Sequence, residues 1–288
     1  MERRDNMKEK YRDHLCGMIK DEDGEVLVCG FVENIRDHGG ILFVDLRDES
    51  GVVQLVSNDD RIFMHLLKES SIQVSGTVRK RQEDDYNEKI STGTVEILVS
   101  SLKVLGQVKG LLPFEVRTSH EVNEETRLRY RYLDLRNNKN HDLIVFRSEV
   151  IKYIRKMMDR DNFLEVQTPI ITASSPEGAR DFLVPSRKFK GKFYALPQAP
   201  QIFKQLLMVS GFEKYYQIAP CFRDEDARSD RLYGEFYQLD LEMAYVSEED
   251  VLEEGKKIFK SIFKKFGNKK ISSFKVLTYK ESMEWYGT

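Results

Sequence analysis

Short runs of β-branched and apolar residues fill the chain from residue 24 to residue 105, separated by Gly, Asn, Asp or Ser. This spacing is typical of strands connected by turns. A segment with helical character, residues 59–69, lies between the third and the fourth run. Five strands with a helical piece at this place predict a small β-barrel of the OB type. The five runs are EVLVCGFV, GILFVDLRD, GVVQLVS, SIQVSGTVRKR and TVEILVSSLKVLG.

A polar stretch that is dense in arginine, residues 106–141, follows the predicted barrel. We interpret it as a linker or hinge that leads into the first helix of a second domain. Beyond it, five apolar residues recur at helical spacing and predict a long helix, for which Asp142 is a candidate N-cap. The five are Leu143, Phe146, Val150, Ile154 and Met157. We therefore divide the chain into residues 1–105, 106–141 and 142–288.

The second domain mixes strands and helices. Residues 162–172 have the composition of a strand with one proline at a bend or an edge, and residues 174–184 indicate a loop that leads into a further strand. Residues 198–212 predict a helix, with Pro200 in its first turn and Gly211 at its end.

A last helix is predicted to begin at Ser247, where Asp250 three residues later completes a pattern that resembles a capping box. Strands and helices do not alternate as regular βαβ units, which favours an antiparallel sheet. The predicted fold class is α+β, with an OB-type barrel followed by an antiparallel-sheet domain.

Residues 215–246 predict a β-hairpin, because apolar residues alternate with polar ones on both sides of a charged loop. If the two strands pair, their polar faces coincide. The shared polar face carries Gln217, Arg223, Glu225, Phe236, Gln238, Asp240 and Glu242. This face is either a solvated surface or the floor of a site. Acids stacked this closely need a cation nearby, and an aromatic ring among polar residues can stack on a base.

The composition excludes several classes of protein. Lys and Arg number 46 against 48 Asp and Glu, for a formal net charge of −2, so the chain is not a uniformly basic nucleic-acid binder. Its three cysteines, Cys16, Cys29 and Cys221, lie far apart, and its histidines form no cluster, so we expect no metal site. It contains no apolar run of membrane length and no signal peptide, and we expect a cytoplasmic protein.

The hairpin contains FRDED, then Arg228 and Arg231, then EFYQLDLEM, and this order resembles the second signature motif of class II aminoacyl-tRNA synthetases. Within that class it is most similar to aspartyl-tRNA synthetases of the bacterial type. FLEVQTPII resembles the first motif, which implies a homodimer interface near Pro169. SPEGARDFLVPSR and FYALPQAPQIFKQLLM resemble a mobile loop and a substrate-binding segment, and CGFVENIRDHGGILFVDLRDESGVVQLV resembles the anticodon-binding barrel.

The resemblance implies an aspartate–tRNA ligase, which joins L-aspartate to ATP and then transfers the aspartyl group to tRNA-Asp. Neither step needs a protein nucleophile, so catalysis depends on positioning and on charge stabilisation. Arg223 is the implied catalytic residue, because a planar guanidinium can bridge the α-phosphate and the substrate carboxylate. The implied ATP-binding residues are Arg223, Asp224, Glu225, Arg231 and Phe236.

For aspartate the resemblance implies Glu177, Gln201, Lys204, Arg223, Gln238 and Asp240. Lys204 can pair with the substrate side-chain carboxylate, although a lysine on a helix is more often a surface residue. Two details depart from the family pattern. Ala199 stands where serine is common, and the RLYGEF turn is one residue longer than usual, which leaves Leu232 and Tyr233 without a clear counterpart.

In the barrel, Phe43 lies on a polar strand face, where an aromatic ring suits stacking on an unpaired base. The resemblance implies that Arg36, Phe43 and Gln54 contact the anticodon. The DHGG segment, which contains His38, resembles the variants that charge both tRNA-Asp and tRNA-Asn. ENIRD lacks one arginine of the common family run, so anticodon selectivity differs in this interpretation.

The third motif of the family, with its second ATP-binding arginine and the usual Mg²⁺ ligands, has no match in this chain. We therefore expect a truncated, catalytically incomplete fragment that binds tRNA, while the family uses ATP with Mg²⁺. A non-catalytic, tRNA-binding paralogue is the alternative. An enzyme that uses asparagine is a second alternative, and Lys204 argues against it because a neutral amide needs no cationic partner.

Overall fold

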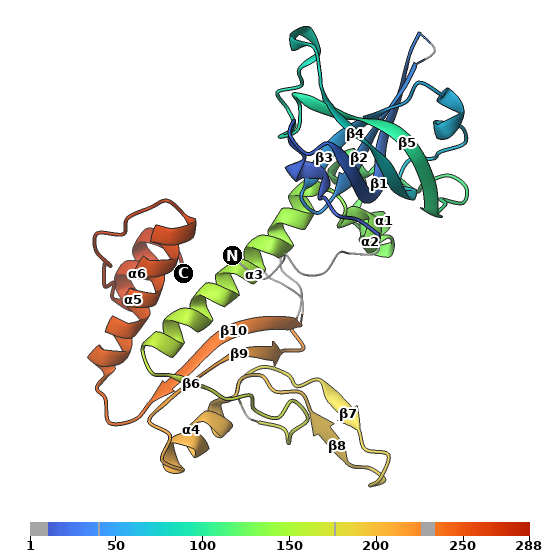
Figure 1. The fold of residues 1–288 in the computed structure, drawn as a ribbon. Coiled ribbons are helices and arrows are strands. Elements are labelled where there is room, and N and C mark those ends of the chain that lie inside the picture. The colour runs from blue at the N-terminus through green and yellow to red at the C-terminus, as the bar shows by residue number, and fades with distance from the viewer. Residues whose placement is uncertain (1–10, 40, 176, 226–233) are drawn as a thin grey trace. The chain divides into compact units, whose positions relative to one another are not determined.

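A computed structural model describes residues 11–39, 41–175, 177–225 and 234–288 (Figure 1). Backbone contacts separate the chain into two compact units, with the division between Pro113 and Phe114. Arg228, Arg231, Leu232 and Tyr233 of the predicted hairpin loop lie outside the described residues. Each unit has a core of its own and is described by itself.

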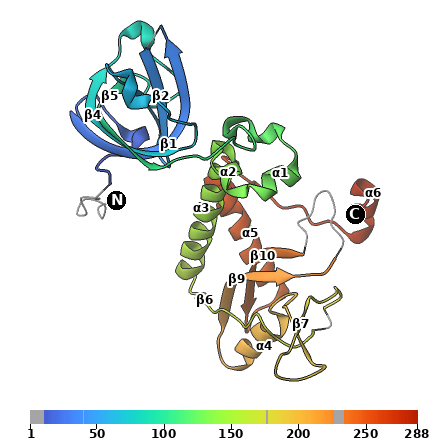
Figure 2. The ribbon, with the colours of Figure 1, turned by 90° about the vertical axis from the view of Figure 1, so that its right-hand side faces the viewer.

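The first unit is a closed five-stranded barrel, as the sequence predicts (Figure 2). Its strand order is β1-β2-β3-β5-β4, and the parallel pairing of β3 with β5 closes the ring that the antiparallel pairs begin. The strands are β1 (Glu25–His38), β2 (Ile41–Asp48), β3 (Gly51–Val56), β4 (Ser71–Lys80) and β5 (Val95–Gly106).

Alternate residues of these strands fill the barrel, and Val28, Leu46 and Ile97 are fully buried in its core. The predicted helical piece at 59–69 is only a single 3₁₀ turn, η2 (Asp60–Phe63). It ends there because Met64 is extended, and no helix resumes because His65 and Glu69 adopt positive φ angles of 67° and 64°. The first unit also contains the short turns η1 (Cys16–Met18) and η3 (Glu83–Asp85).

The second unit begins with short helical segments from the stretch that we interpreted as a linker and helical lead. They are η4 (Val116–Glu121), α1 (Glu124–Arg129) and α2 (Arg131–Asp134), and the long helix α3 (Asn138–Arg160) follows. The prediction of Asp142 as N-cap is wrong. Asn137 caps α3, because its side-chain oxygen accepts a hydrogen bond from the Lys139 amide while its side-chain nitrogen donates to the carbonyl oxygens of Val116 and Arg117.

A three-stranded sheet with the order β10-β9-β6 forms the centre of the second unit. It consists of β6 (Leu164–Glu165), β9 (Lys214–Phe222) and β10 (Glu235–Met243), and a separate ribbon pairs β7 (Leu183–Pro185) with β8 (Phe193–Ala195). The strand predicted over 162–172 has only two residues in regular pairing. The ladder stops because the Thr168 amide donates to the Gln217 side chain, and the next residue, Pro169, has no amide hydrogen.

The sheet lies between helices (Figure 1). Helices α3 and α5 (Glu248–Phe266) cover the apolar face, where Ile154, Tyr216 and Ile258 belong to one buried cluster. Helix α4 (Gln201–Val209) contacts β9 and β10, and a short helix, α6 (Tyr279–Tyr286), ends the chain. No helix in the described part of the chain is long and apolar enough to span a bilayer.

The ends of α4 and α5 agree with the predictions in most details. The Ser247 and Asp250 side chains form both hydrogen bonds of a capping box at the start of α5. Gly211 follows the end of α4 with a positive φ of 88°. Pro200, which was expected in the first turn of α4, occupies the N-cap position one residue earlier.

Candidate functional site

The hairpin of β9 and β10 brings the predicted polar residues onto one face. Phe236 pairs with Cys221, Gln238 with Ala219, and Asp240 with Gln217, so the two polar faces coincide as the alternation predicts. This face is not a solvated surface. Gln217 and Asp240 are only 4% and 9% exposed, because α4 and the loops around it cover them.

Lys204 reaches from α4 to the acids of the floor. Its Nζ lies 3.0 Å from Asp240 Oδ1 and 3.2 Å from Glu242 Oε2. Burial disfavours the charge on Lys204, but the hydrogen bonds to Asp240 and Glu242 outweigh it and raise the pKa of Lys204. Burial also raises the pKa of Asp240, although Lys204 acts in the opposite direction. The acids that stack on this face therefore have the cation that they need within the chain.

Arg223 and Phe236 lie together at the other end of the floor. The guanidinium carbon of Arg223 lies 5.0 Å from the centroid of the Phe236 ring, and the Arg223 amide donates to the Gly234 carbonyl at 2.8 Å. The Glu225 amide donates to the Arg223 carbonyl at 2.9 Å. An arginine on the face of an aromatic ring offers charge to a phosphate and a flat surface to a base.

The pKa of the buried Cys221 thiol responds to several charges of the site. Burial raises the pKa of its thiol to about 11, the Arg223 charge lowers it, and the charges of Asp240 and Glu177 raise it. Glu177, on the loop before β7, accepts a hydrogen bond from the Ser175 hydroxyl at 3.2 Å. Arg223, Asp240 and Glu177 therefore all act electrostatically on the buried Cys221 thiol.

Two residues beside this floor were not predicted from the sequence. Gln198 is 2% exposed, and its amide group bonds to the loop that carries Glu177. Arg180 bonds through its Nε to the Asp224 carbonyl at 3.0 Å. Both residues stand in segments that the resemblance singled out, but neither has a charge pattern or a spacing that distinguishes it from a turn residue.

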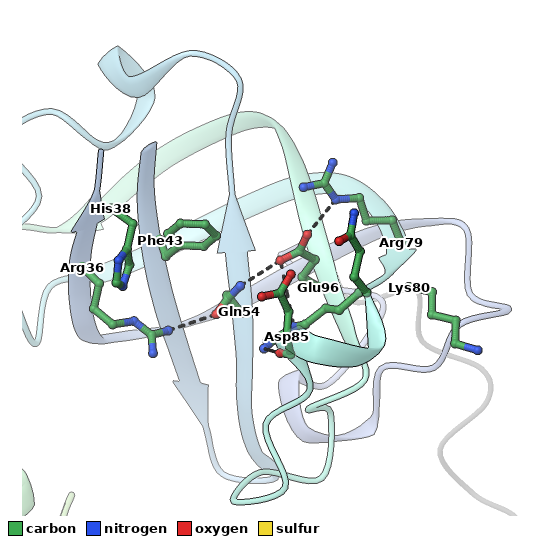
Figure 3. Close-up of a pocket in the computed structure, with 10 residues that line it drawn as sticks. Arg36, His38, Phe43, Gln54, Arg79, Lys80, Asp85 and Glu96 are labelled. Carbon is green, nitrogen blue, oxygen red and sulfur yellow. Dashed lines mark hydrogen bonds and ion pairs between the residues drawn. The ribbon is translucent and has the colours of Figure 1, made fainter. Parts of the chain in front are cut away.

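The second candidate site is a pocket of about 480 Å³ on the barrel (Figure 3). It brings together all four predicted anticodon residues, Arg36, His38, Phe43 and Gln54. The His38 and Phe43 rings meet edge to face, with centroids 6.0 Å apart.

A chain of hydrogen bonds crosses the floor of this pocket. Arg36 donates to Asp45 at 2.6 Å and to Gln54 at 3.0 Å, and Gln54 donates to Glu96 at 2.8 Å. Arg79 donates to Glu96 from the far side at 2.7 Å. Six further lining residues were not predicted from the sequence, although the RKR run at the end of β4 is a visible basic signal. They are Arg79, Lys80, Arg81, Gln82, Asp85 and Glu96.

The described residues contain no group of three or more His, Cys, Asp or Glu side chains that could hold a metal ion. The two sites present cationic, acidic, amide and aromatic side chains. These groups suit nucleotides, unpaired bases and zwitterions.

Two family models match the chain. The model for an OB-fold nucleic acid binding domain matches residues 26–105, and the model for class II tRNA synthetases (D, K and N) matches residues 123–288. The chain belongs to the class II tRNA synthetases of the D, K and N type, with an OB-fold barrel followed by part of the catalytic domain.

The curated relatives identify the branch of this family. An aspartate–tRNA(Asp/Asn) ligase of Anaplasma phagocytophilum is 54% identical over 96% of this chain and 48% of its own length. The ligase of the same name from Orientia tsutsugamushi is 53% identical over 97% of this chain and 48% of its own. The chain is a homologue of aspartate–tRNA(Asp/Asn) ligases and spans about half of the length of these relatives.

Two solved structures share the fold. A putative aspartyl-tRNA synthetase from Leishmania major is 25% identical with a TM-score of 0.79, over 91% of this chain and 54% of that one. The asparaginyl-tRNA synthetase from Pyrococcus horikoshii, complexed with asparaginyl-adenylate, is 26% identical with a TM-score of 0.77, over 90% of this chain and 58% of that one.

Proposed function

We propose that this chain supplies the anticodon-binding barrel and the substrate floor of an aspartate–tRNA ligase that charges tRNA-Asp and tRNA-Asn. The observation that carries the proposal is the buried set of opposite charges on the β9–β10 floor. L-Aspartate has two carboxylates and one ammonium group, and its recognition needs two cations and at least one acid. Arg223, Lys204 and Asp240 are of these kinds and lie on or against one sheet face.

Lys204 supplies the side-chain selectivity in this proposal. Its ammonium group is held beside Asp240 and Glu242 and is raised in pKa, so it stays charged at neutral pH. The substrate side-chain carboxylate would join this cluster, with Gln201 of the same helix beside it. The neutral amide of asparagine would form no ion pair with this ammonium, so L-aspartate gains more from the contact. Glu177, Gln238 and Asp240 face the substrate ammonium in the proposal.

ATP, bound with Mg²⁺ as in this family, would lie at the end of the floor with Arg223 and Phe236. Phe236 offers a ring to the adenine, and Arg223 offers a guanidinium to the α-phosphate, where charge develops during acyl-adenylate formation. Asp224 and Glu225 follow Arg223 directly and would contact the adenine or orient the arginine. Arg231, which belongs to the same proposal, lies outside the described residues.

The barrel pocket is the proposed anticodon site. Phe43 supplies a stacking surface, Arg36 and Gln54 supply hydrogen-bonding groups for base edges, and His38 meets Phe43 at the rim. Because Arg36 and Gln54 already bond to each other, and Gln54 bonds to Glu96, their orientations are set before RNA arrives.

A homodimer through the first-motif region is part of the proposal. Leu143 and Phe146 at the start of α3, and Ile170 and Ile171 after β6, are exposed by 64%, 50%, 47% and 60%. Large apolar residues that gather in neighbouring segments favour burial against a second copy. We propose a cytoplasmic location, where the tRNA and ATP substrates are found.

The barrel proposal is tested by binding of the anticodon stem-loop of tRNA-Asp to the 288-residue chain. Phe43→Ala removes the stacking surface and is expected to weaken binding about tenfold to a hundredfold. Phe43→Tyr keeps the ring and serves as the matched control, with near wild-type affinity expected. A stem-loop with an unrelated anticodon should bind more weakly than those of tRNA-Asp and tRNA-Asn. Equal binding of all stem-loops, unaffected by Phe43→Ala, would contradict the proposal.

The substrate proposal is tested by binding of L-aspartate and L-asparagine to the same chain, measured by calorimetry or NMR titration. L-Aspartate is expected to bind more tightly, and Lys204→Met is expected to remove that preference. A preference that survives Lys204→Met would show that another group selects the side chain.

A further inference from the structure

Gln198 makes an unusual set of contacts with the loop that carries Glu177. It accepts a hydrogen bond at its Oε1 from the Ala179 amide at 3.1 Å, and its Nε2 donates to the Ala179 carbonyl at 2.9 Å. The same Nε2 lies 3.4 Å from the Ser175 carbonyl and also donates to the Asp181 carboxylate. One side chain thus binds both the N–H and the C=O group of Ala179, as a paired strand would.

The residue next to Ala179, Arg180, bonds to a different segment of the chain. The Asp224 amide donates to the Arg180 carbonyl at 2.9 Å, and Arg180 Nε donates to the Asp224 carbonyl at 3.0 Å. Asp224 directly follows Arg223 in the chain. Ala179 is therefore bonded to Gln198, and the next residue, Arg180, is bonded to Asp224 in a different segment.

We propose that Gln198 is a positioning residue that, through Ala179 and Arg180, sets the loop bearing Glu177 in a fixed relation to Arg223. The inference rests on the proposed function for the roles of Glu177 and Arg223. Glu177 stands two residues before Ala179, and Arg223 one residue before Asp224. We name the two ties, Gln198 to Ala179 and Arg180 to Asp224, the loop clip.

An amide side chain is suited to this task for a chemical reason. Only Gln and Asn carry a neutral donor and a neutral acceptor side by side, so one group can satisfy both backbone groups of a facing residue. Because Gln198 is 2% exposed, water does not compete for these bonds, and their loss leaves buried polar groups without partners. A side chain that only filled space would not need this pattern.

The first test measures amide hydrogen exchange in the ligand-free chain, so it does not depend on the proposed function. Gln198→Met keeps the size of the side chain and removes its hydrogen bonds. We expect exchange to become about tenfold faster at the Ala179 amide and also at the Asp224 amide. Gln205→Met, on an exposed position of α4, is the matched control and should change neither rate. Unchanged exchange in the β9–β10 ladder would show that the unit remains folded.

A purely local role gives a different result. If Gln198 only held its own contact, exchange at Ala179 would accelerate while exchange at Asp224 stayed at the wild-type rate, and the loop clip would be refuted. If the β9–β10 ladder also opens in Gln198→Met, the Gln198→Glu variant is measured in place of Gln198→Met. That variant keeps the acceptor for the Ala179 amide and loses the donor, and the same comparison of Ala179 with Asp224 decides the question.

The second test measures L-aspartate affinity by calorimetry. If the wild-type chain binds L-aspartate, Gln198→Met should weaken binding about tenfold, and Gln205→Met should leave it unchanged. Equal affinity of wild type and Gln198→Met would overturn the positioning role. If wild type shows no binding while Gln198→Met accelerates exchange at both amides, the proposed function fails and the loop clip stands.

Discussion

Lys204 shows how single contacts decide the character of the site. The alternation of residues 235–243 places Asp240 and Glu242 on one face, where two acids alone would repel each other. The Lys204 ammonium lies within 3.2 Å of both carboxylates and removes that repulsion. Its side chain is 13% exposed and that of Asp240 is 10% exposed, so the pair is screened little by solvent.

Lys204→Met should therefore lower the free energy of unfolding of the second unit by about 2 kcal/mol, because it leaves the Asp240 charge buried without its cation. Urea denaturation measures this change. Lys190→Met, at an exposed position between β7 and β8, is the control and should have almost no effect. The double variant Lys204→Met with Asp240→Asn should recover part of the loss. A double variant no more stable than Lys204→Met would argue against the ion pair.

The same residues predict an alkaline loss of stability. Burial disfavours the Lys204 charge, but hydrogen bonds to Asp240 and Glu242 raise its pKa above the ordinary 10.5, and burial raises the pKa of Tyr215 above the ordinary 10.0. A raised pKa in the folded state favours the protonated form. The stability that it contributes is therefore complete below the ordinary value and is lost as the pH rises through the folded value.

We expect the free energy of unfolding to fall above about pH 10, and to fall less steeply in the Tyr215→Phe variant, which cannot ionise. Urea denaturation at several pH values measures the slope. An identical slope for Tyr215→Phe and wild type would show that other groups carry the alkaline loss.

At the scale of elements, two glycines at helices of the second unit have opposite roles. Gly211 ends α4 with a φ of 88°, whereas Gly255 lies inside α5 with ordinary helical geometry. A Cβ atom added at either position would meet nothing within 4 Å. Any difference between the two substitutions must therefore come from the backbone and not from a clash.

Gly211→Ala should destabilise the second unit by about 1 kcal/mol, because alanine does not favour a positive φ. Gly255→Ala should stabilise it by up to about 1 kcal/mol, because alanine loses less entropy in a helix. The two variants serve as controls for each other in thermal denaturation. Shifts of the same sign would contradict this account.

At the scale of the whole molecule, the chain has two separate cores. Leu46 and Ile97 belong to the barrel core, while Met158 and Tyr216 belong to the core between the sheet and the helices α3 and α5. Leu46 and Met158 are both fully buried, so truncation of either creates a cavity that costs about 2–5 kcal/mol.

Calorimetry should therefore resolve two unfolding transitions. Leu46→Ala should lower the transition temperature of the barrel alone, and Met158→Ala that of the second unit alone. If each variant lowered both transitions together, the two units would unfold as one.

The alternation of residue types predicted a large part of the fold. The five barrel strands, the shared polar face of β9 and β10, the capping box of α5 and the glycine after α4 follow from local rules, and the structure confirms them. The predicted N-cap of α3, Asp142, lies five residues beyond the actual one, because the cap depends on where Asn137 finds the carbonyl groups of Val116 and Arg117.

The sequence by itself determined which residues face the same side of a strand and where several helices begin and end, because these properties depend on neighbours within about four residues. Only the tertiary structure decided which of these faces meet. Gln54 reaches Glu96, 42 residues away, because β3 pairs with β5 when the barrel closes. Gln198 reaches Ala179 because the pairing of β7 with β8 brings the two segments side by side, and no period in the sequence records that contact.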